Sequence, residues 1–162
     1  MTTQALFDKI VNHLVTQGEP SGRHRKRVAD FECLYRSVGS NGQTTMCAVG
    51  CLISDEVYAE HFDSDEDENT LEGACAVNEM IKRAVVDSNP GILFTQKDFG
   101  LLADCQIAHD SAARESGRPD NTIDKGLFMR NLLKRMSHVA GLYRLVVPDA
   151  LHKAAGQASA NG

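Results

Sequence analysis

Three cysteines in the first third of the chain form the densest group of reactive side chains in the sequence. Cys33 precedes an Asn41-Gly42 pair, and Cys47 and Cys51 follow that pair. An Asn-Gly pair between two short runs of alternating apolar and polar residues is typical of a β-hairpin turn. We therefore expect two antiparallel strands that bring Cys33 and Cys47 side by side, with Cys51 nearby.

A structural zinc site is one interpretation of this group. Cys33, Cys47 and Cys51 would supply three ligands, and Cys105 or His109, one helical turn apart, would supply the fourth. The Cys-x3-Cys spacing is looser than the usual Cys-x2-Cys spacing of zinc sites. We therefore favour free cysteines that pack as small apolar side chains, with no cofactor.

A catalytic thiol is another interpretation. Cys47 or Cys51, with Cys47 favoured, would be the nucleophile of a hydrolase or transferase, its thiolate stabilised by a helix N-terminus within residues 50–54. His109 would be the base, with Asp110 beside it. Adjacent side chains of a helix point about 100° apart, so we expect Asp110 to be poorly placed to orient His109. A structural role for the pair is the simpler expectation.

Two runs of like charge are candidate contact surfaces, although each is also typical of a solvated loop. The acidic run begins like a calcium-binding loop, but Glu68 and Ala74 occupy the positions that need a glycine and a bidentate glutamate. We therefore expect a solvated acidic loop there. The basic run contains Arg23, Arg25, Lys26 and Arg27, and the acidic run contains Asp63, Asp65, Glu66 and Asp67.

Composition and charge exclude several classes of protein. Apolar residues make up 42% and charged residues 24% of the 162 residues, which is typical of a folded globular domain. The formal net charge of −5 argues against a protein dedicated to nucleic acid, because phosphate binding needs a basic face. A nucleic-acid contact would have to involve the basic run. The common motifs of nucleotide-binding proteins, serine hydrolases, zinc proteases and deaminases are absent.

The sequence also favours a cellular location for the protein. The five cysteines cannot all pair, and the N-terminal residues lack the charged start and the apolar run of a signal peptide. No apolar run approaches the roughly 20 residues needed to cross a bilayer. We expect a cytoplasmic protein with reduced thiols and no membrane contact.

The spacing of apolar residues predicts a helix-dominated α+β fold with a short antiparallel hairpin. Residues 142–147 are rich in branched side chains, which predicts a third strand that pairs with the hairpin. We expect one globular domain over residues 1–155 and a flexible C-terminal tail over residues 156–162. Helices are expected over residues 3–17, and after the capping residues Ser54, Asn69, Thr95 and Asn121.

The cysteine motif resembles a group of small uncharacterised phage and prophage proteins. The resemblance rests on Cys33-Leu34-Tyr35-Arg36, on the run from Cys47 through Gly50-Cys51-Leu52-Ile53 to Glu56, and on the helix of residues 101–110. The group has no established activity, so the resemblance implies a phage-like setting and no reaction. A looser similarity extends to small actinobacterial proteins with Asn-Asp in place of His109-Asp110, which implies that His109 is not a general base.

Binding is therefore the function that the sequence favours. We expect a phage- or prophage-type protein that binds a host macromolecule through its charged loops. The expected partner is a protein, and binding could inhibit it. A cysteine-dependent hydrolase or transferase and a zinc-stabilised interaction module remain the alternatives.

Overall fold

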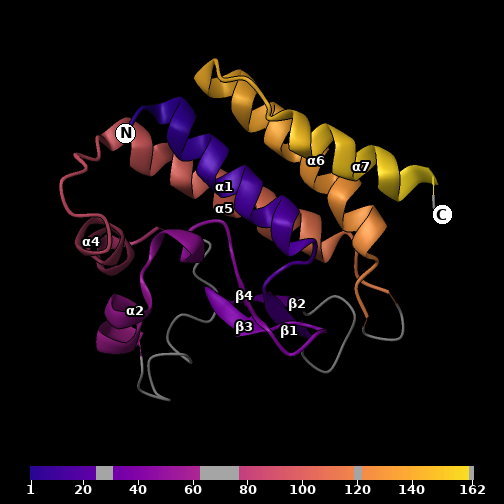
Figure 1. The fold of residues 1–162 in the computed structure, drawn as a ribbon, viewed down its shortest axis with the longest axis horizontal. Coiled ribbons are helices and arrows are strands. Elements are labelled where there is room, and N and C mark those ends of the chain that lie inside the picture. Colours follow the sequence, from indigo (N-terminus) through magenta and orange to yellow (C-terminus); the bar gives the residue numbers. More distant parts are fainter. Residues whose placement is uncertain (25–30, 63–76, 119–121, 161–162) are drawn as a thin grey trace.

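Long helices form the main body of the fold (Figure 1). The computed structural model describes residues 1–24, 31–62, 77–118 and 122–160. The long helices are α1 (Thr3–Gln17), α5 (Gln96–Arg114), α6 (Lys125–Tyr143) and α7 (Asp149–Ala160). Contacts link α1 to α5, α5 to α6, α6 to α7 and α7 back to α1. The helices therefore pack as a bundle around a common apolar core.

Helix α1 has the bounds that its apolar spacing predicts. Its apolar stripe is buried in the bundle, because residues three and four positions apart share one face of a helix. The Thr2 hydroxyl accepts a hydrogen bond from the Ala5 N–H, and Gly18 ends the helix with a left-handed φ of 71°. The buried stripe consists of Leu6, Phe7, Ile10, Val11 and Leu14.

Helix α5 begins at the expected cap and is tied to α1. The Thr95 hydroxyl and the Asp98 carboxylate form a reciprocal capping box. The Thr3 hydroxyl also donates to Asp98 Oδ1 at 3.0 Å. Burial alone would raise the pKa of Asp98, but the hydrogen bonds from Thr95 and Thr3 lower it below its usual range.

Short antiparallel strand pairs lie beside the bundle within the described residues. Strand β1 (Gly22–His24) pairs with β2 (Phe31–Cys33), and β3 (Arg36–Val38) pairs with β4 (Thr44–Met46). The β3–β4 pair is the predicted hairpin, and Gly42 has a φ of 76° in its turn.

The position of Cys33 differs from the prediction. Cys33 pairs with Gly22 on β1 and does not face the strand that leads to Cys47. The chain leaves β2 at Leu34, whose N–H donates to the Ser21 carbonyl, and starts β3 only after Tyr35. Cys33 therefore lies on a different strand from the one that pairs with β4, so the expectation that the hairpin brings Cys33 and Cys47 side by side is wrong.

Smaller helices lie outside the bundle. They are α2 (Asp55–Phe62), α4 (Glu79–Asp87) and the single turn η1 (Gly50–Leu52). Helices α2 and α4 contact each other, and η1 contacts α1. The Ser54 hydroxyl accepts the Val57 N–H, which confirms the predicted helix start after Ser54. The N-cap of α4 is Asn78, whereas Asn69 lies outside the described residues.

The end of the chain is more helical than expected. The predicted strand over residues 142–147 is wrong, because α6 continues to Tyr143 and the backbone N–H and C=O of Val146 are bonded by the Gln4 side chain. Helix α7 extends through residue 156, where we expected the tail to begin, and ends at Ala160. Alanine-rich segments are good helix formers, and Leu151 and Ala155 bury one face of α7.

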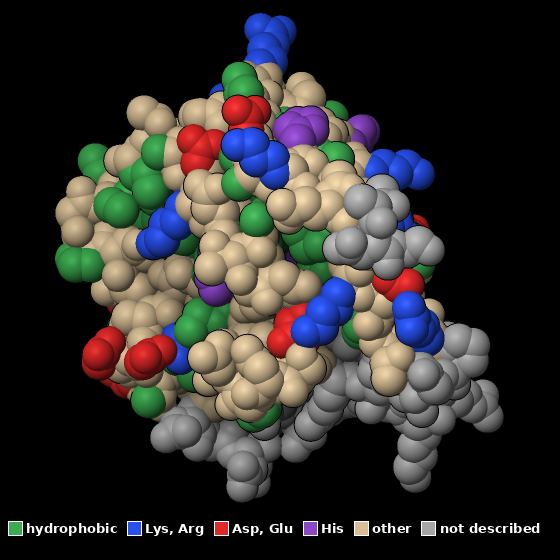
Figure 2. Space-filling view, turned by 45° about the vertical axis from the view of Figure 1, so that its right-hand side comes forward, with side chains coloured by type: hydrophobic (Ala, Val, Ile, Leu, Met, Phe, Trp, Pro, Cys, Tyr) green, Lys and Arg blue, Asp and Glu red, His purple; other side chains and the backbone are tan. Residues whose placement is uncertain are grey.

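The architecture is the predicted helix-dominated α+β class. Within the described ranges, no helix is long and apolar enough to cross a membrane. On the face drawn in Figure 2, several Lys and Arg side chains lie directly beside Asp or Glu side chains. Ion pairs within the described residues include Arg118–Asp124 and Arg135–Glu115.

Candidate functional site

A cluster of polar side chains is buried between α5 and the strands. We call Ser21, Cys33, Gln106, His109 and Asp110 the buried polar cluster. His109 is 0% exposed and Asp110 is 2% exposed. Buried polar groups of this kind must satisfy each other's hydrogen bonds, because water cannot.

The hydrogen bonds define the tautomer of His109. The Ser21 N–H donates to Nε2 over 3.4 Å, so Nε2 is an acceptor. The remaining ring proton is then on Nδ1, which lies 2.9 Å from Asp110 Oδ1 and donates to it. The same carboxylate oxygen accepts a 2.7 Å hydrogen bond from Gln106 Nε2. Both ring nitrogens of His109 are therefore engaged in hydrogen bonds.

The expectation that Asp110 is poorly placed to orient His109 is wrong. Nδ1 is the ring nitrogen nearer the backbone, so it can reach the next side chain along the helix. Gln106, one turn earlier, holds the carboxylate in place. Phe128 of α6 packs edge-on against the imidazole, with 5.9 Å between ring centroids. The pair is buried in the interior, and the structural role that the sequence favoured stays a prediction.

Gln106 connects the cluster to the cysteine motif. Its Oε1 accepts the N–H of Val49 over 3.2 Å, while its Nε2 donates to Asp110. The segment that carries Cys47 is thereby fastened to α5. Sequence analysis missed Gln106 and Ser21. The available signal for Gln106 was its place four residues before Asp110, on the same helix face.

The thiols nearest the cluster are poor nucleophiles. The Cys33 thiol hydrogen-bonds to Asp110, and burial together with this carboxylate raises its pKa. Cys47 is completely buried, and its Sγ accepts the Gly50 N–H over 3.3 Å. Burial, followed by the charge of Asp110, raises the pKa of Cys47 as well. A reactive cysteine needs the opposite shift.

Two other thiols are also held in the protonated form. Burial raises the pKa of Cys51 to about 12, and its Sγ donates to the Ala48 carbonyl. Burial raises the pKa of Cys105 on α5. Cys75 lies outside the described residues. These environments suit cysteines that pack as apolar side chains.

The predicted charged surfaces fall almost entirely outside the described part of the chain. Arg23 is a residue of β1, and its backbone alone is described. The remaining members of the two runs, which lie outside the described residues, are Arg25, Lys26, Arg27, Asp63, Asp65, Glu66 and Asp67.

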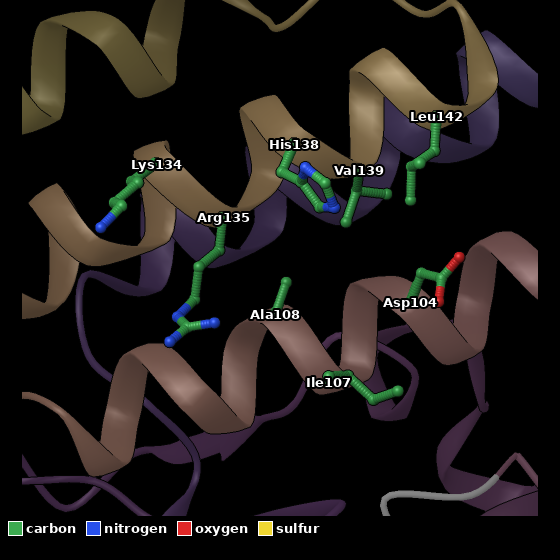
Figure 3. A pocket seen from close by; sticks show the side chains of 8 residues that line it. All are labelled: Asp104, Ile107, Ala108, Lys134, Arg135, His138, Val139 and Leu142. Atoms are coloured by element: carbon green, nitrogen blue, oxygen red, sulfur yellow. The ribbon is translucent and has the colours of Figure 1, made fainter.

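A groove between α5 and α6 is a surface feature that the sequence analysis did not identify (Figure 3). Its volume is about 450 Å³. Ala108 and Val139, each 4% exposed, form an apolar floor. Ile107 and Leu142 are 48% and 60% exposed at its edges. The groove is therefore an apolar depression with exposed apolar edges, open to solvent.

The polar side chains that line the groove differ in whether they already have a partner within the protein. Lys134 and His138 are exposed, and neither has an ion-pair partner among the residues that the structure describes. Arg135 pairs with Glu115, and Asp104 accepts a 2.8 Å hydrogen bond from the Tyr143 hydroxyl. The exposed polar groups left for a ligand are thus the Lys134 ammonium and the His138 imidazole.

Comparison with protein-family models, with curated proteins and with solved structures finds no match to this chain. The interpretation of the groove and of the buried polar cluster therefore rests on their own geometry.

Proposed function

We propose that the protein acts by binding a partner protein in the groove between α5 and α6. The exposure of Ile107 and Leu142 on either side of an apolar floor is the observation that carries this proposal. Exposed apolar side chains that surround a depression are characteristic of interaction sites. In the phage-like setting that the sequence suggests, the partner would be a host protein.

The shape of the groove favours a helix as the bound element. Lys134 and Leu142, which mark its extent along α6, are separated by eight residues, or about 12 Å of helix. An amphipathic helix of two or three turns would place an apolar side chain every three or four residues along this length. Its apolar face would cover Ile107, Val139 and Leu142.

The charge of the groove favours an acidic flank on that helix. Lys134 and His138 lie on α6 beside the apolar floor. A carboxylate on the partner would meet Lys134 at the edge of the contact, where charges mainly increase the association rate and select partners. The protein as a whole carries a net charge of −5, so the cation of Lys134 gives the groove a local charge opposite to that of the whole chain.

Changing Leu142 to glutamate is expected to weaken partner binding by at least about tenfold, because the change buries a charge against the apolar floor. The partner would first be captured from a bacterial host lysate on the immobilised full-length protein. Its affinity for wild type and variant would then be measured with the purified components.

Leu93→Glu is the matched control, because Leu93 is 92% exposed in the loop before α5 and does not line the groove. Both changes are at exposed positions, so both proteins should unfold at the wild-type temperature. Equal affinity of wild type and Leu142→Glu would show that the groove is not the interface. Retention of no host component by the wild-type protein would contradict binding altogether.

A further inference from the structure

We propose that Cys33, His109 and Asp110 form a binding site for a divalent transition-metal ion such as Zn²⁺. Their donor atoms, a thiol sulfur, an imidazole nitrogen and a carboxylate oxygen, all lie within 4.8 Å of one another. Cys33 comes from β2, and the other two residues come from α5. This proposal does not depend on partner binding in the groove.

The donor set is chemically suited to zinc. Thiolate, imidazole and carboxylate groups are the protein ligands that Zn²⁺ accepts, and a mixed sulfur, nitrogen and oxygen set disfavours Mg²⁺ and Ca²⁺. The set differs from the combination considered from sequence, because Cys47 and Cys51 do not belong to this group of donor atoms. Three protein ligands leave one position of a tetrahedral ion for water.

The residues around the donors hold them in place. Gln106 donates to Asp110 Oδ1 and is itself fixed by the Val49 N–H. Phe128 packs against the ring of His109. Metal sites need this support, because ligands that are already oriented lose little freedom when the ion binds.

Without a metal ion, hydrogen bonds hold the three donor groups together. The Cys33 thiol and His109 Nδ1–H both donate to the Asp110 carboxylate, which draws the three donor atoms together. On metal binding through Nδ1, the thiol proton leaves to solvent and the imidazole proton moves to Nε2. The long contact from the Ser21 N–H to Nε2 is then given up.

A bound ion would strengthen an existing contact between β2 and α5. Strands β1 and β2 have three residues each, and isolated pairs of such strands are marginal in water. The ion would fasten this pair to α5 of the bundle. Cys33 is only half-buried, which gives an ion a route from solvent.

Cobalt titration of the full-length protein tests the site. The protein is first freed of metal with a chelator and kept reduced. We expect Co²⁺ to produce a near-ultraviolet band from thiolate-to-metal charge transfer that saturates at one ion per chain. Zn²⁺ should abolish the band and raise the unfolding temperature, because a ligand that binds the folded state stabilises it.

Variants distinguish this site from other thiols. Cys33→Ser should lose the charge-transfer band, and Asp110→Asn should weaken cobalt binding at least tenfold. Cys51→Ser, which changes a thiol outside the group, should titrate like wild type. Absence of the band in wild type would overturn the proposal whether or not the variants fold. An unchanged band in Cys33→Ser would overturn it as well.

Discussion

Replacing Asp110 with alanine should lower the free energy of unfolding by about 3–5 kcal/mol, measured by urea denaturation in the presence of a chelator. The change leaves three donors, the Gln106 amide, His109 Nδ1–H and the Cys33 thiol, without their common acceptor. The Gln106 and His109 donors are held in the interior, where water does not replace the lost partner, and the half-buried Cys33 thiol adds less to the loss.

Asp8→Ala is a close control for this prediction. Asp8 accepts a 2.7 Å hydrogen bond from Gln4, four residues earlier on α1, as Asp110 does from Gln106 on α5. Asp8 is only half-buried, so its replacement should cost less than about 1 kcal/mol. Similar losses for Asp8→Ala and Asp110→Ala would mean that the buried polar cluster adds nothing beyond an ordinary side-chain hydrogen bond.

Changing Gly50 to alanine is expected to cost about 3 kcal/mol of stability. A Cβ atom at residue 50 would lie 2.2 Å from the carbonyl oxygen of Tyr35. That carbonyl accepts the Cys47 N–H over 3.1 Å, so it cannot move away without breaking the bond that holds Cys47 in place. The measurement is the midpoint of urea unfolding. The slope of the free energy of unfolding against urea concentration should stay unchanged, as expected for two-state unfolding.

Gly156→Ala provides the contrast, because a Cβ atom at Gly156 in α7 would meet nothing within 4 Å. Alanine is the better helix former, so this variant should be as stable as wild type or up to about 1 kcal/mol more stable. A Gly50→Ala protein with wild-type stability would show that the cysteine segment does not approach Tyr35 as described.

Helices with strong local signals were predictable from the sequence. The apolar stripe of α1 and the Thr95–Asp98 capping box of α5 are determined by residues close together in the chain. The β3–β4 hairpin was also predictable, because the Asn41-Gly42 turn specifies it locally.

The strand pairs beyond that hairpin depend on distant contacts. Strand β2 is held by its pairing with β1 and by the Leu34 N–H bond to the Ser21 carbonyl, and the segment after Tyr143 stays irregular because the Gln4 side chain bonds both backbone groups of Val146. Neither contact leaves a pattern in the local sequence. Local strand propensity was therefore overridden by tertiary structure.

The candidate sites were predictable only in part. Cys33, His109 and Asp110 stood out by residue type, but their convergence depends on the packing of β2 against α5. The groove depends on the spacing of α5 and α6. Its one sequence signal was Ile107, an apolar residue that lies off the buried stripe of α5.

Site-specific photocrosslinking from the groove tests partner binding most directly. A photoreactive amino acid would replace Ile107, or Leu93 as the control position, in the otherwise unchanged protein. We predict that residue 107 crosslinks to one partner protein and that the crosslinked segment is an amphipathic helix with an acidic flank. Residue 93 should give none of these crosslinks. Failure to crosslink from residue 107, or the same products from both positions, would contradict the proposal that the groove between α5 and α6 binds the partner.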